Sequence, residues 1–314
     1  MAVLVTGGTG FVGSYVVHAL ARHGRNVVSF DRFPDSEVVA RFPAGVALAE
    51  GDTSEREHLA ALFRAHPDID RVVHLAYLMG AESEADPPLA MRVNVLGTAN
   101  VFAEAAARKV ARVVFMSSES VYGSRQSAYG DRPVTEDDFC APRDHVLNYS
   151  LSKLLNEHLA RSYEERTGVS FVSLRAPVVF GAGRKRGTTV WASEFATGPA
   201  LGRAVTLPFP PDDRNCYIYV EDLAEQIARL CVKPSLAHRV YNSGGHTVRA
   251  AELADLVRRV VPAAGISFND QAPPSPFINR MDDRRIRAEI EFTLRPMEEA
   301  VRAHVERVRR DHER

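Results

Sequence analysis

The segment Ala2-Val-Leu-Val-Thr-Gly-Gly-Thr-Gly-Phe-Val-Gly13 decides the fold of this 314-residue chain. Residues 2–5 form an apolar run typical of a buried strand, and the apolar periodicity of 14–23 predicts a helix. Between them, glycines let the backbone turn tightly and approach a ligand, while the helix N-terminus offers free N–H groups and the positive end of its dipole. A glycine-rich turn alone is weak evidence. In this strand–loop–helix context it predicts a dinucleotide pyrophosphate site made by Gly7, Gly10, Phe11, Val12 and Gly13.

Short apolar runs continue to alternate with helical patterns over the first half of the chain. We expect strands at 26–30, 46–49, 72–76, 111–116 and 170–174, and helices at 56–66, 88–109 and 148–167. Strands that alternate with helices predict a parallel sheet covered on both faces. Since crossovers in such sheets are right-handed, a doubly wound arrangement is expected.

Acidic residues after the second and third expected strands bear on the kind of dinucleotide. Asp31 stands 18 residues past Gly13, where a carboxylate accepts hydrogen bonds from adenosine ribose hydroxyls and repels a 2′-phosphate. It therefore favours NAD over NADP. Arg32 has two interpretations, a partner for that phosphate or a solvent-exposed loop residue. Asp52, followed by Thr53, either reaches the adenine edge or caps the next helix.

The chain changes character after residue 175. Prolines and glycines cluster in 177–187, 198–211 and 262–276, and helices are expected at 220–230, 248–260 and 296–312. We predict an α/β protein with an NAD-binding Rossmann domain over 1–176, to which a segment of about 215–243 returns. A smaller α/β substrate lobe is expected over 177–214 and 244–314.

Two side chains four residues apart on the helix expected at 148–167 suggest acid–base chemistry. Tyr149 and Lys153 share one face of that helix. A phenol with an ordinary pKa of about 10 is a poor base at neutral pH, but a neighbouring ammonium favours its phenolate. The pair gains weight from Ser117, Ser118 and Ser120, because they stand at the carboxyl end of an expected strand, where open parallel sheets bind ligands. One of these serine hydroxyls is expected to hold the reacting oxygen together with the tyrosine, unless each only stabilises a turn.

Composition excludes several classes of protein. The formal net charge is −1, which provides no general attraction for nucleic acid or an anionic membrane. Three widely spaced cysteines, at 140, 216 and 231, predict neither a disulfide framework nor a metal site, and fit the cytoplasm. The N-terminus lacks a basic segment and is interpreted as a strand, not as a signal peptide.

The ordered set of motifs resembles the extended short-chain dehydrogenase/reductase family, also called the NAD-dependent epimerase/dehydratase family. The resemblance covers nearly the whole chain. It rests on residues 6–13, Asp31, 51–52, 74–76, 94–97, 117–123, 149–153, 174–175 and 217–224.

The resemblance implies a catalytic trio of Ser118, Tyr149 and Lys153, with Lys153 also holding the nicotinamide ribose. It further implies a homodimer formed through the helices at 88–109 and 148–167. The remaining residues that it assigns to the cofactor site are Leu75, Ala76, Asn94, Ser117 and Pro177.

Departures from the family pattern bear on the substrate. Members that bind nucleotide sugars usually carry an asparagine where this chain has Val178, and an arginine where it has Asn215, with Arg214 one residue out of register. Two diphosphate contacts are therefore missing. Dehydratases place Asp-Glu where this chain has Glu119-Ser120, so Glu119 can serve as an acid but the carbon base is absent. Dehydration is therefore disfavoured.

The segment 181–189 is the candidate replacement for the diphosphate contacts. Its Gly-Thr-Thr weakly resembles the bacterial threonine dehydrogenases of the same family. Arg184 or Arg186 can pair with a carboxylate, or the loop is simply basic and solvated. Thr188 and Thr189 either contact substrate or cap the following helix.

These observations predict an NAD-dependent oxidoreductase with Tyr149 as acid/base. Hydride transfer would occur at a secondary alcohol or ketone of a small polar substrate, such as a sugar, a sugar acid or a hydroxy acid. The alternative is a nucleotide-sugar 4-epimerase with the same trio. A non-catalytic dinucleotide sensor is the third interpretation, although sensors of this family usually lack the tyrosine–lysine pair.

Overall fold

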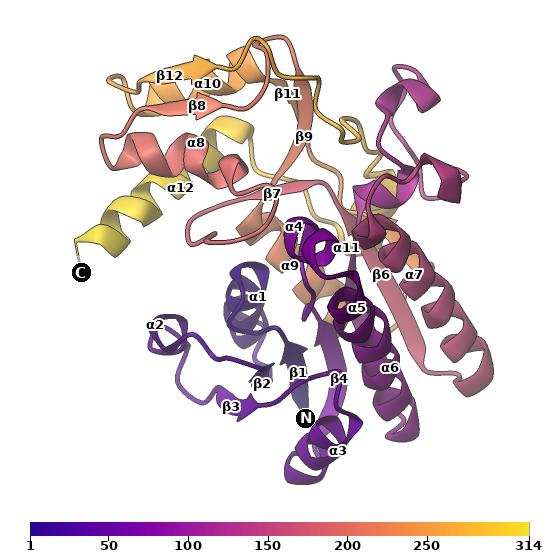
Figure 1. The fold of residues 1–314 in the computed structure, drawn as a ribbon. Helices are drawn as coiled ribbons and strands as arrows, with labels where there is room; N and C mark the ends of the chain where they lie inside the picture. The colour runs from indigo at the N-terminus through magenta and orange to yellow at the C-terminus, as the bar shows by residue number, and fades with distance from the viewer. Residues whose placement is uncertain (314) are drawn as a thin grey trace.

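Residues 1–313, which the computed structural model describes, contain a main sheet of seven parallel strands (Figure 1). The strand order is β10-β6-β5-β4-β1-β2-β3, so the strand before the glycine loop lies near the middle and pairs with both β2 and β4. The confirmed doubly wound order reverses direction beside this strand, which is where such sheets bind ligands. The strands are β1 (Ala2–Thr6), β2 (Asn26–Asp31), β3 (Ala47–Glu50), β4 (Ile69–His74), β5 (Arg112–Ser118), β6 (Ser170–Ala176) and β10 (Val240–Asn242).

Helices cover both faces of the main sheet. The apolar side chains of β1 are therefore buried on both sides. Val3 and Val5 pack into the core formed with α1 (Phe11–Arg22) and α9 (Val220–Val232). Ala2 and Leu4 pack into the opposite core, with α3 (Arg56–Ala65), α6 (Thr98–Ala107) and α7 (Asn148–Thr167). The alternation follows from the two-residue period of a strand.

The helix expected at 88–109 runs without a gap from Pro87 to Ala107, but it is not a regular α-helix throughout. It consists of α5 (Pro87–Ala90), a π-helical stretch (Met91–Gly97) and α6. The wider turn lets the buried Asn94 hydrogen-bond both the N–H and the carbonyl of Leu78, at 2.7 and 3.1 Å. Periodicity alone cannot show such a change of helix type, because the apolar pattern continues through it. Two shorter helices complete this half, α2 (Ser36–Val39) and α4 (Gly80–Ala85), and 3₁₀ turns at Glu119–Tyr122, Gln126–Tyr129 and Pro142–Asp144 follow β5.

A second group of elements gathers above the main sheet in Figure 1. β9 (Arg214–Tyr219) pairs with β7 (Val178–Phe180) and with β11 (His246–Arg249), and β8 (Val205–Leu207) pairs with β12 (Ile266–Phe268). The helices here are α8 (Trp191–Ala200), α10 (Ala250–Val260) and α12 (Met297–His312).

Two details of this region differ from the sequence-based expectation. β9 pairs in the second sheet and not in the main one. The segment that returns to the main sheet therefore begins with α9, after the expected start at about 215, and it ends with β10. α8 was not among the expected helices, and it extends into the proline- and glycine-rich stretch 198–211, with Pro199 in its last turn. Gly198 allows this helix end to pack on β8, since a Cβ there would lie 2.4 Å from Val205 Cγ1. α11 (Arg284–Ile290) packs near β10 and α9.

Candidate active site

A cavity of about 1120 Å³ runs along the carboxyl ends of the main-sheet strands and under the loop after β7. Nearly all residues that the sequence proposes for the site line this cavity. Asn94 and Lys153 do not, and both lie beneath its wall. The lining includes Gly7, Gly10, Phe11, Val12, Gly13, Asp31, Arg32, Asp52, Thr53, Leu75, Ala76, Ser117, Ser118, Ser120, Tyr149, Pro177, Arg184, Thr188 and Thr189.

The glycine loop has the geometry that a pyrophosphate requires. Gly7 has φ +70°, and a Cβ on it would lie 2.8 Å from the backbone nitrogen of Ala76. A Cβ on Gly13 would lie 2.0 Å from the carbonyl oxygen of Gly7. The helix α1 starts after Gly10 without a side-chain cap, so its first N–H groups remain available to a ligand. The chain therefore presents a fitting cradle for a dinucleotide.

Asp31 is held beside the glycine loop at the position expected for ribose recognition. Its Oδ2 accepts hydrogen bonds from the N–H and hydroxyl of Thr9, at 3.1 and 2.8 Å, and its Oδ1 accepts one from the Arg32 N–H. A carboxylate has about four acceptor positions, so one remains for a ribose hydroxyl. Sequence reasoning missed Thr9, although it lies inside the quoted loop.

Arg32 and Asp52 form an ion pair, which neither interpretation of Arg32 anticipated. Arg32 Nε lies 3.4 Å from Asp52 Oδ2, and the Arg32 side chain is half-exposed. Asp52 Oδ1 also accepts hydrogen bonds from the N–H and hydroxyl of Ser54, both at 2.8 Å, and so closes a turn before α3. The carboxylate of Asp52 opposes any 2′-phosphate that Arg32 would attract.

Asn94 shapes the cofactor wall indirectly. Its amide holds the backbone of Leu78 and donates to the hydroxyl of Ser83 at 3.1 Å. These bonds fix the loop that follows β4, which carries Leu75 and Ala76 to the cavity. We conclude that Asn94 supports the wall and does not line it.

Lys153 is packed between two aromatic rings. Its Nζ donates to the carbonyl of Met116 at 2.7 Å, and lies 3.2 Å from the ring centre of Tyr77 and 5.5 Å from that of Tyr149. Burial lowers the pKa of Lys153 to about 7, against the attraction of Glu157. Sequence reasoning missed Tyr77, whose ring stands perpendicular to Tyr149 with centres 5.5 Å apart. Its signal was its place directly after the 74–76 motif.

Tyr149 lies in a polar cluster at the inner end of the cavity. Burial above all, and then the charge of Glu119, raise its pKa, while Ser118 and Arg184 act in the opposite direction. We expected Lys153 to lower this pKa. In the structure, Arg184 is a second cation that lowers it, while the Lys153 Nζ lies 5.5 Å from the centre of the Tyr149 ring and donates to the Met116 carbonyl.

Glu119 is the second buried acid of this cluster. Ser118 Oγ donates to Glu119 Oε2 at 2.9 Å, and burial raises the pKa of Glu119 to about 7. Ser120 donates to Ser118 Oγ from both its N–H and its hydroxyl, at 3.2 and 3.0 Å. Ser118 is therefore surrounded by its own chain neighbours as well as facing Tyr149.

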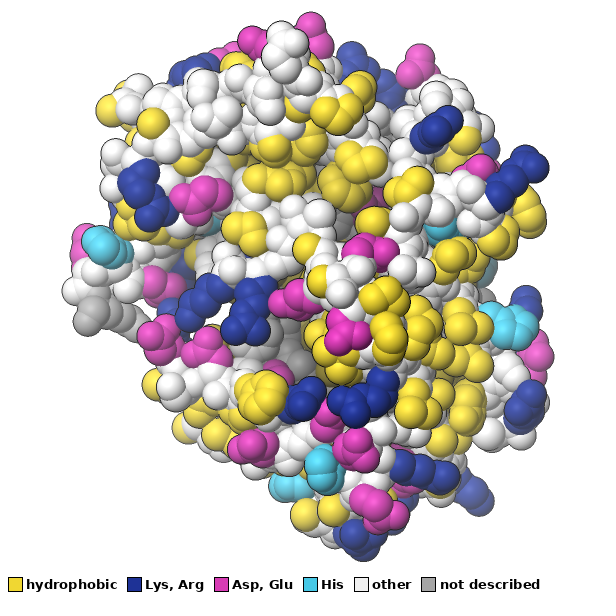
Figure 2. Space-filling model, viewed as in Figure 1, with side chains coloured by type: hydrophobic (Ala, Val, Ile, Leu, Met, Phe, Trp, Pro, Cys, Tyr) yellow, Lys and Arg dark blue, Asp and Glu magenta, His cyan; other side chains and the backbone are white. Residues whose placement is uncertain are grey.

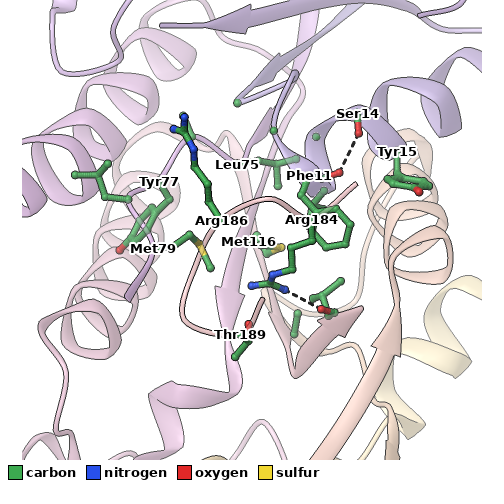
Figure 3. Close-up of a pocket in the computed structure, with 18 of the residues that line it drawn as sticks. Phe11, Ser14, Tyr15, Leu75, Tyr77, Met79, Met116, Arg184, Arg186 and Thr189 are labelled. Atoms are coloured by element: carbon green, nitrogen blue, oxygen red, sulfur yellow. Dashed lines mark hydrogen bonds between the residues drawn. The ribbon is translucent and has the colours of Figure 1, made fainter. Parts of the chain in front are cut away.

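The loop after β7 sends two arginines in different directions, as Figure 3 shows. Arg184 points inward, donates to the carbonyl of Val179 at 2.8 Å, and leaves its buried Nε without a hydrogen-bond partner among the described residues. Burial lowers the pKa of Arg184 to about 10, against the attraction of Tyr149 and Glu119. Arg186 is exposed and points away from Arg184. Arg184 is thus the better placed cation for a substrate.

The same loop is tied to two other parts of the cavity rim. Thr188 Oγ1 accepts a hydrogen bond from the Ala81 N–H at 3.0 Å, so it binds the start of α4 and does not cap α8. Lys185 Nζ lies 3.3 Å from Asp35 and 3.2 Å from Glu37, across the cavity entrance near α2. Figure 2 shows basic and acidic side chains meeting over this hollow.

The positions expected to lack diphosphate contacts are occupied by other interactions. Val178 is buried in the apolar core. The side-chain oxygen of Asn215 accepts from Ser275 Oγ at 2.5 Å. Arg214 is exposed, whereas Asn215 is 1% exposed, because neighbouring strand residues face opposite sides. Arg214 therefore cannot replace an arginine at 215.

Comparison with known proteins assigns the family. The model of the NAD-dependent epimerase/dehydratase family matches residues 3–244. The chain belongs to this family. As a member it is an NAD-dependent enzyme of the extended short-chain dehydrogenase/reductase type, as the motifs indicated.

Its sequence relatives and its structural neighbours include enzymes of different names. A UDP-glucose 4-epimerase of Azospirillum brasilense is 32% identical over 295 residues, which cover 87% of this chain and 82% of the relative. The structure of a UDP-glucose 4-epimerase from Thermus thermophilus in complex with NAD is 26% identical, with a TM-score of 0.80 over 98% of this chain and 99% of that one. An L-threonine dehydrogenase from Clostridium difficile shares the fold, with a TM-score of 0.85, 19% identity and coverage of 98% and 96%.

Two kinds of feature are absent from the described residues 1–313. They contain no helix that is long and apolar enough to cross a membrane. They also contain no group of three or more histidine, cysteine, aspartate or glutamate side chains placed to hold a metal ion.

Proposed function

We propose that this enzyme is an NAD-dependent dehydrogenase or reductase that acts on a secondary alcohol or ketone of a small polar substrate. The carrying observation is the inner end of the cavity, where Ser118, Tyr149 and the inward-pointing Arg184 converge. Arg184 supports a substrate with a carboxylate, such as a hydroxy acid or a sugar acid. Val178 is buried in the apolar core and Asn215 is bonded to Ser275, so neither position offers the expected contact to a sugar diphosphate.

The residues of the chain have separable roles in this reaction. The glycine loop and Asp31 hold the dinucleotide, and NAD, when bound, supplies the hydride acceptor. Tyr149 takes the hydroxyl proton of an alcohol substrate, or returns it to a carbonyl oxygen in the reverse direction. Ser118 orients that oxygen, and Lys153 fixes the floor of the site through the Met116 carbonyl.

A screen with NAD across aldoses, uronic acids, hydroxy acids and nucleotide sugars tests the proposal by accumulation of NADH. Replacement Tyr149→Phe is expected to lower kcat on the identified substrate about 10²–10⁴-fold, because the general acid/base is lost. Tyr163→Phe is the matched control, since Tyr163 lies on the same helix but packs against Phe102 and Phe171. Undiminished turnover by the Tyr149→Phe enzyme would refute the mechanism.

A nucleotide-sugar 4-epimerase is the second candidate, and the names of the sequence relatives favour it. An epimerase returns its hydride to the substrate, so UDP-glucose would be converted without net formation of NADH. Measuring the sugar product and the cofactor absorbance in the same sample separates the two activities. Conversion of UDP-glucose at constant NADH would support the epimerase and exclude our first proposal.

We further propose that the protein is a cytoplasmic homodimer. Apolar side chains that are 38–48% exposed, those of Met91, Leu96, Leu151 and Leu155, lie on the adjoining α7 and π-helical segments. Figure 2 shows hydrophobic side chains gathered on this side. The cysteines at 140, 216 and 231 are free thiols, which suits a reducing compartment. Sedimentation of the wild type and of Leu155→Glu tests the dimer, since a monomeric wild type would exclude it.

A further inference from the structure

Ser118 has no proton left to donate to a substrate while its neighbours are arranged in this way. A hydroxyl has one proton and two lone pairs. The proton of Ser118 goes to Glu119 Oε2 at 2.9 Å, and Ser120 fills the lone pairs with its N–H and its hydroxyl. An ionised Glu119 accepts only, so it keeps this proton engaged.

We propose that Glu119 is a positioning residue whose protonation decides whether Ser118 can donate a hydrogen bond to the substrate oxygen. When Glu119 carries a proton, its O–H can donate to Ser118 Oγ, and the rotatable hydroxyl of Ser120 turns away. The proton of Ser118 is then free to point into the cavity. No bond other than hydrogen bonds changes, and the only proton taken up comes from solvent.

The surroundings of Glu119 suit such a change of protonation. Its side chain is buried, with the Tyr149 phenol facing it from α7, the Arg184 guanidinium from the loop after β7 and the Cys216 thiol from β9. Burial raises the pKa of Glu119 to about 7, while the bond from Ser118 and the charge of Arg184 lower it. An ionised Glu119 also raises the pKa of Tyr149. Protonation of Glu119 therefore favours both Ser118 as a donor and Tyr149 as a base.

The first test needs no substrate. Infrared difference spectra of the wild type against Glu119→Gln, recorded from about pH 5 to about pH 9, report the protonated carboxyl of Glu119. We expect its carbonyl band to vanish around pH 7 in the wild type. In Ser118→Ala the loss is expected at higher pH, because the hydrogen bond that stabilises the carboxylate is gone. Absence of the band, or the same midpoint in both proteins, would overturn the proposal.

The second test rests on the proposed function and uses the substrate found in the NAD screen. The amide introduced by Glu119→Gln can donate to Ser118 as the protonated acid does. We expect the ratio of kcat/KM between the wild type and this variant to fall about tenfold per pH unit above pH 7. Glu104→Gln removes a similarly buried carboxylate far from the site and should leave the wild-type pH profile unchanged.

The possible outcomes are distinct. A Glu119→Gln enzyme that folds but is inactive at every pH would show that the carboxylate itself does chemistry, and would overturn the positioning role. A constant ratio across the pH range would also overturn it. If no substrate is found, the proposed function fails, while the infrared titration still decides the link between Glu119 and Ser118.

Discussion

Replacing Glu157 by glutamine should destabilise the enzyme by about 3 kcal/mol, because Arg175 would be left as a buried charge without a partner. Arg175 donates to Glu157 from Nε and Nη2, at 2.9 and 2.6 Å, and the two side chains are only 6% and 8% exposed. Ser117 Oγ donates to the same carboxylate at 2.6 Å. A glutamine keeps one acceptor oxygen and loses the charge, so the lower end of the usual cost, about 3–5 kcal/mol, applies.

Thermal and urea unfolding of Glu157→Gln measure this loss, which corresponds to a fall in Tm of roughly 6 °C at about 2 °C per kcal/mol. Glu104→Gln is the matched control. Glu104 is also buried, but its partner Arg56 is 62% exposed and is hydrated when the carboxylate is removed, so the loss should be clearly smaller. The double replacement Arg175→Met with Glu157→Met should recover most of the stability, because no buried charge remains. Equal losses in the two single variants would refute the reasoning.

Three further predictions concern the cofactor site and the buried histidines. Gly13→Ala should retain its fold, as circular dichroism can show, but its Kd for NAD in calorimetry should rise at least about tenfold, because the new Cβ meets the Gly7 carbonyl. An unchanged Kd would contradict this geometry of the loop. Burial lowers the pKa of His74 and of His304 to about 3 from 6.5. Between about pH 3 and pH 6.5 the unfolded chain therefore binds more protons than the folded one. The free energy of unfolding, measured with urea, should fall as the pH drops below 6.5, by about 1.4 kcal/mol per pH unit for each histidine. The fall should be less steep in His304→Phe. Lys185→Ala should release NADH at most about fivefold faster than the wild type in stopped-flow fluorescence, and its release rate should depend less on salt concentration. The same salt dependence in both enzymes would show that the ion pairs of Lys185 do not act on release.

Features that depend on local sequence could be predicted, and those that depend on distant contacts could not. The helix with Tyr149 and Lys153 begins at Asn148 and ends at Thr167, which are the bounds that the sequence predicted. The strand, loop and helix at the N-terminus were equally local. The partner of Thr188, by contrast, is Ala81, 107 residues away, and no pattern in either segment announces that contact.

The polar cluster shows the same limit within the site itself. Ser118 and Tyr149 could be proposed from motif order, and the structure places both at the cavity. Glu119 was considered only as an acid for dehydration. Its burial and its bond to Ser118 depend on how β5, α7 and the loop after β7 converge, which is decided by the tertiary packing.

The π-helical stretch at Met91–Gly97 has a consequence for deletions. A π turn holds one residue more than an α turn, and each residue of an α-helix rotates the axis by about 100°. Loss of a single residue here would let α5 and α6 join into one regular helix. The rotational phase of Asn94 relative to Phe102 would then change, so the chain could not hold the Leu78 backbone and bury the apolar side of α6 at the same time. Shortening this segment by one residue would loosen the wall of the nucleotide cleft, to which the segment itself contributes Val93.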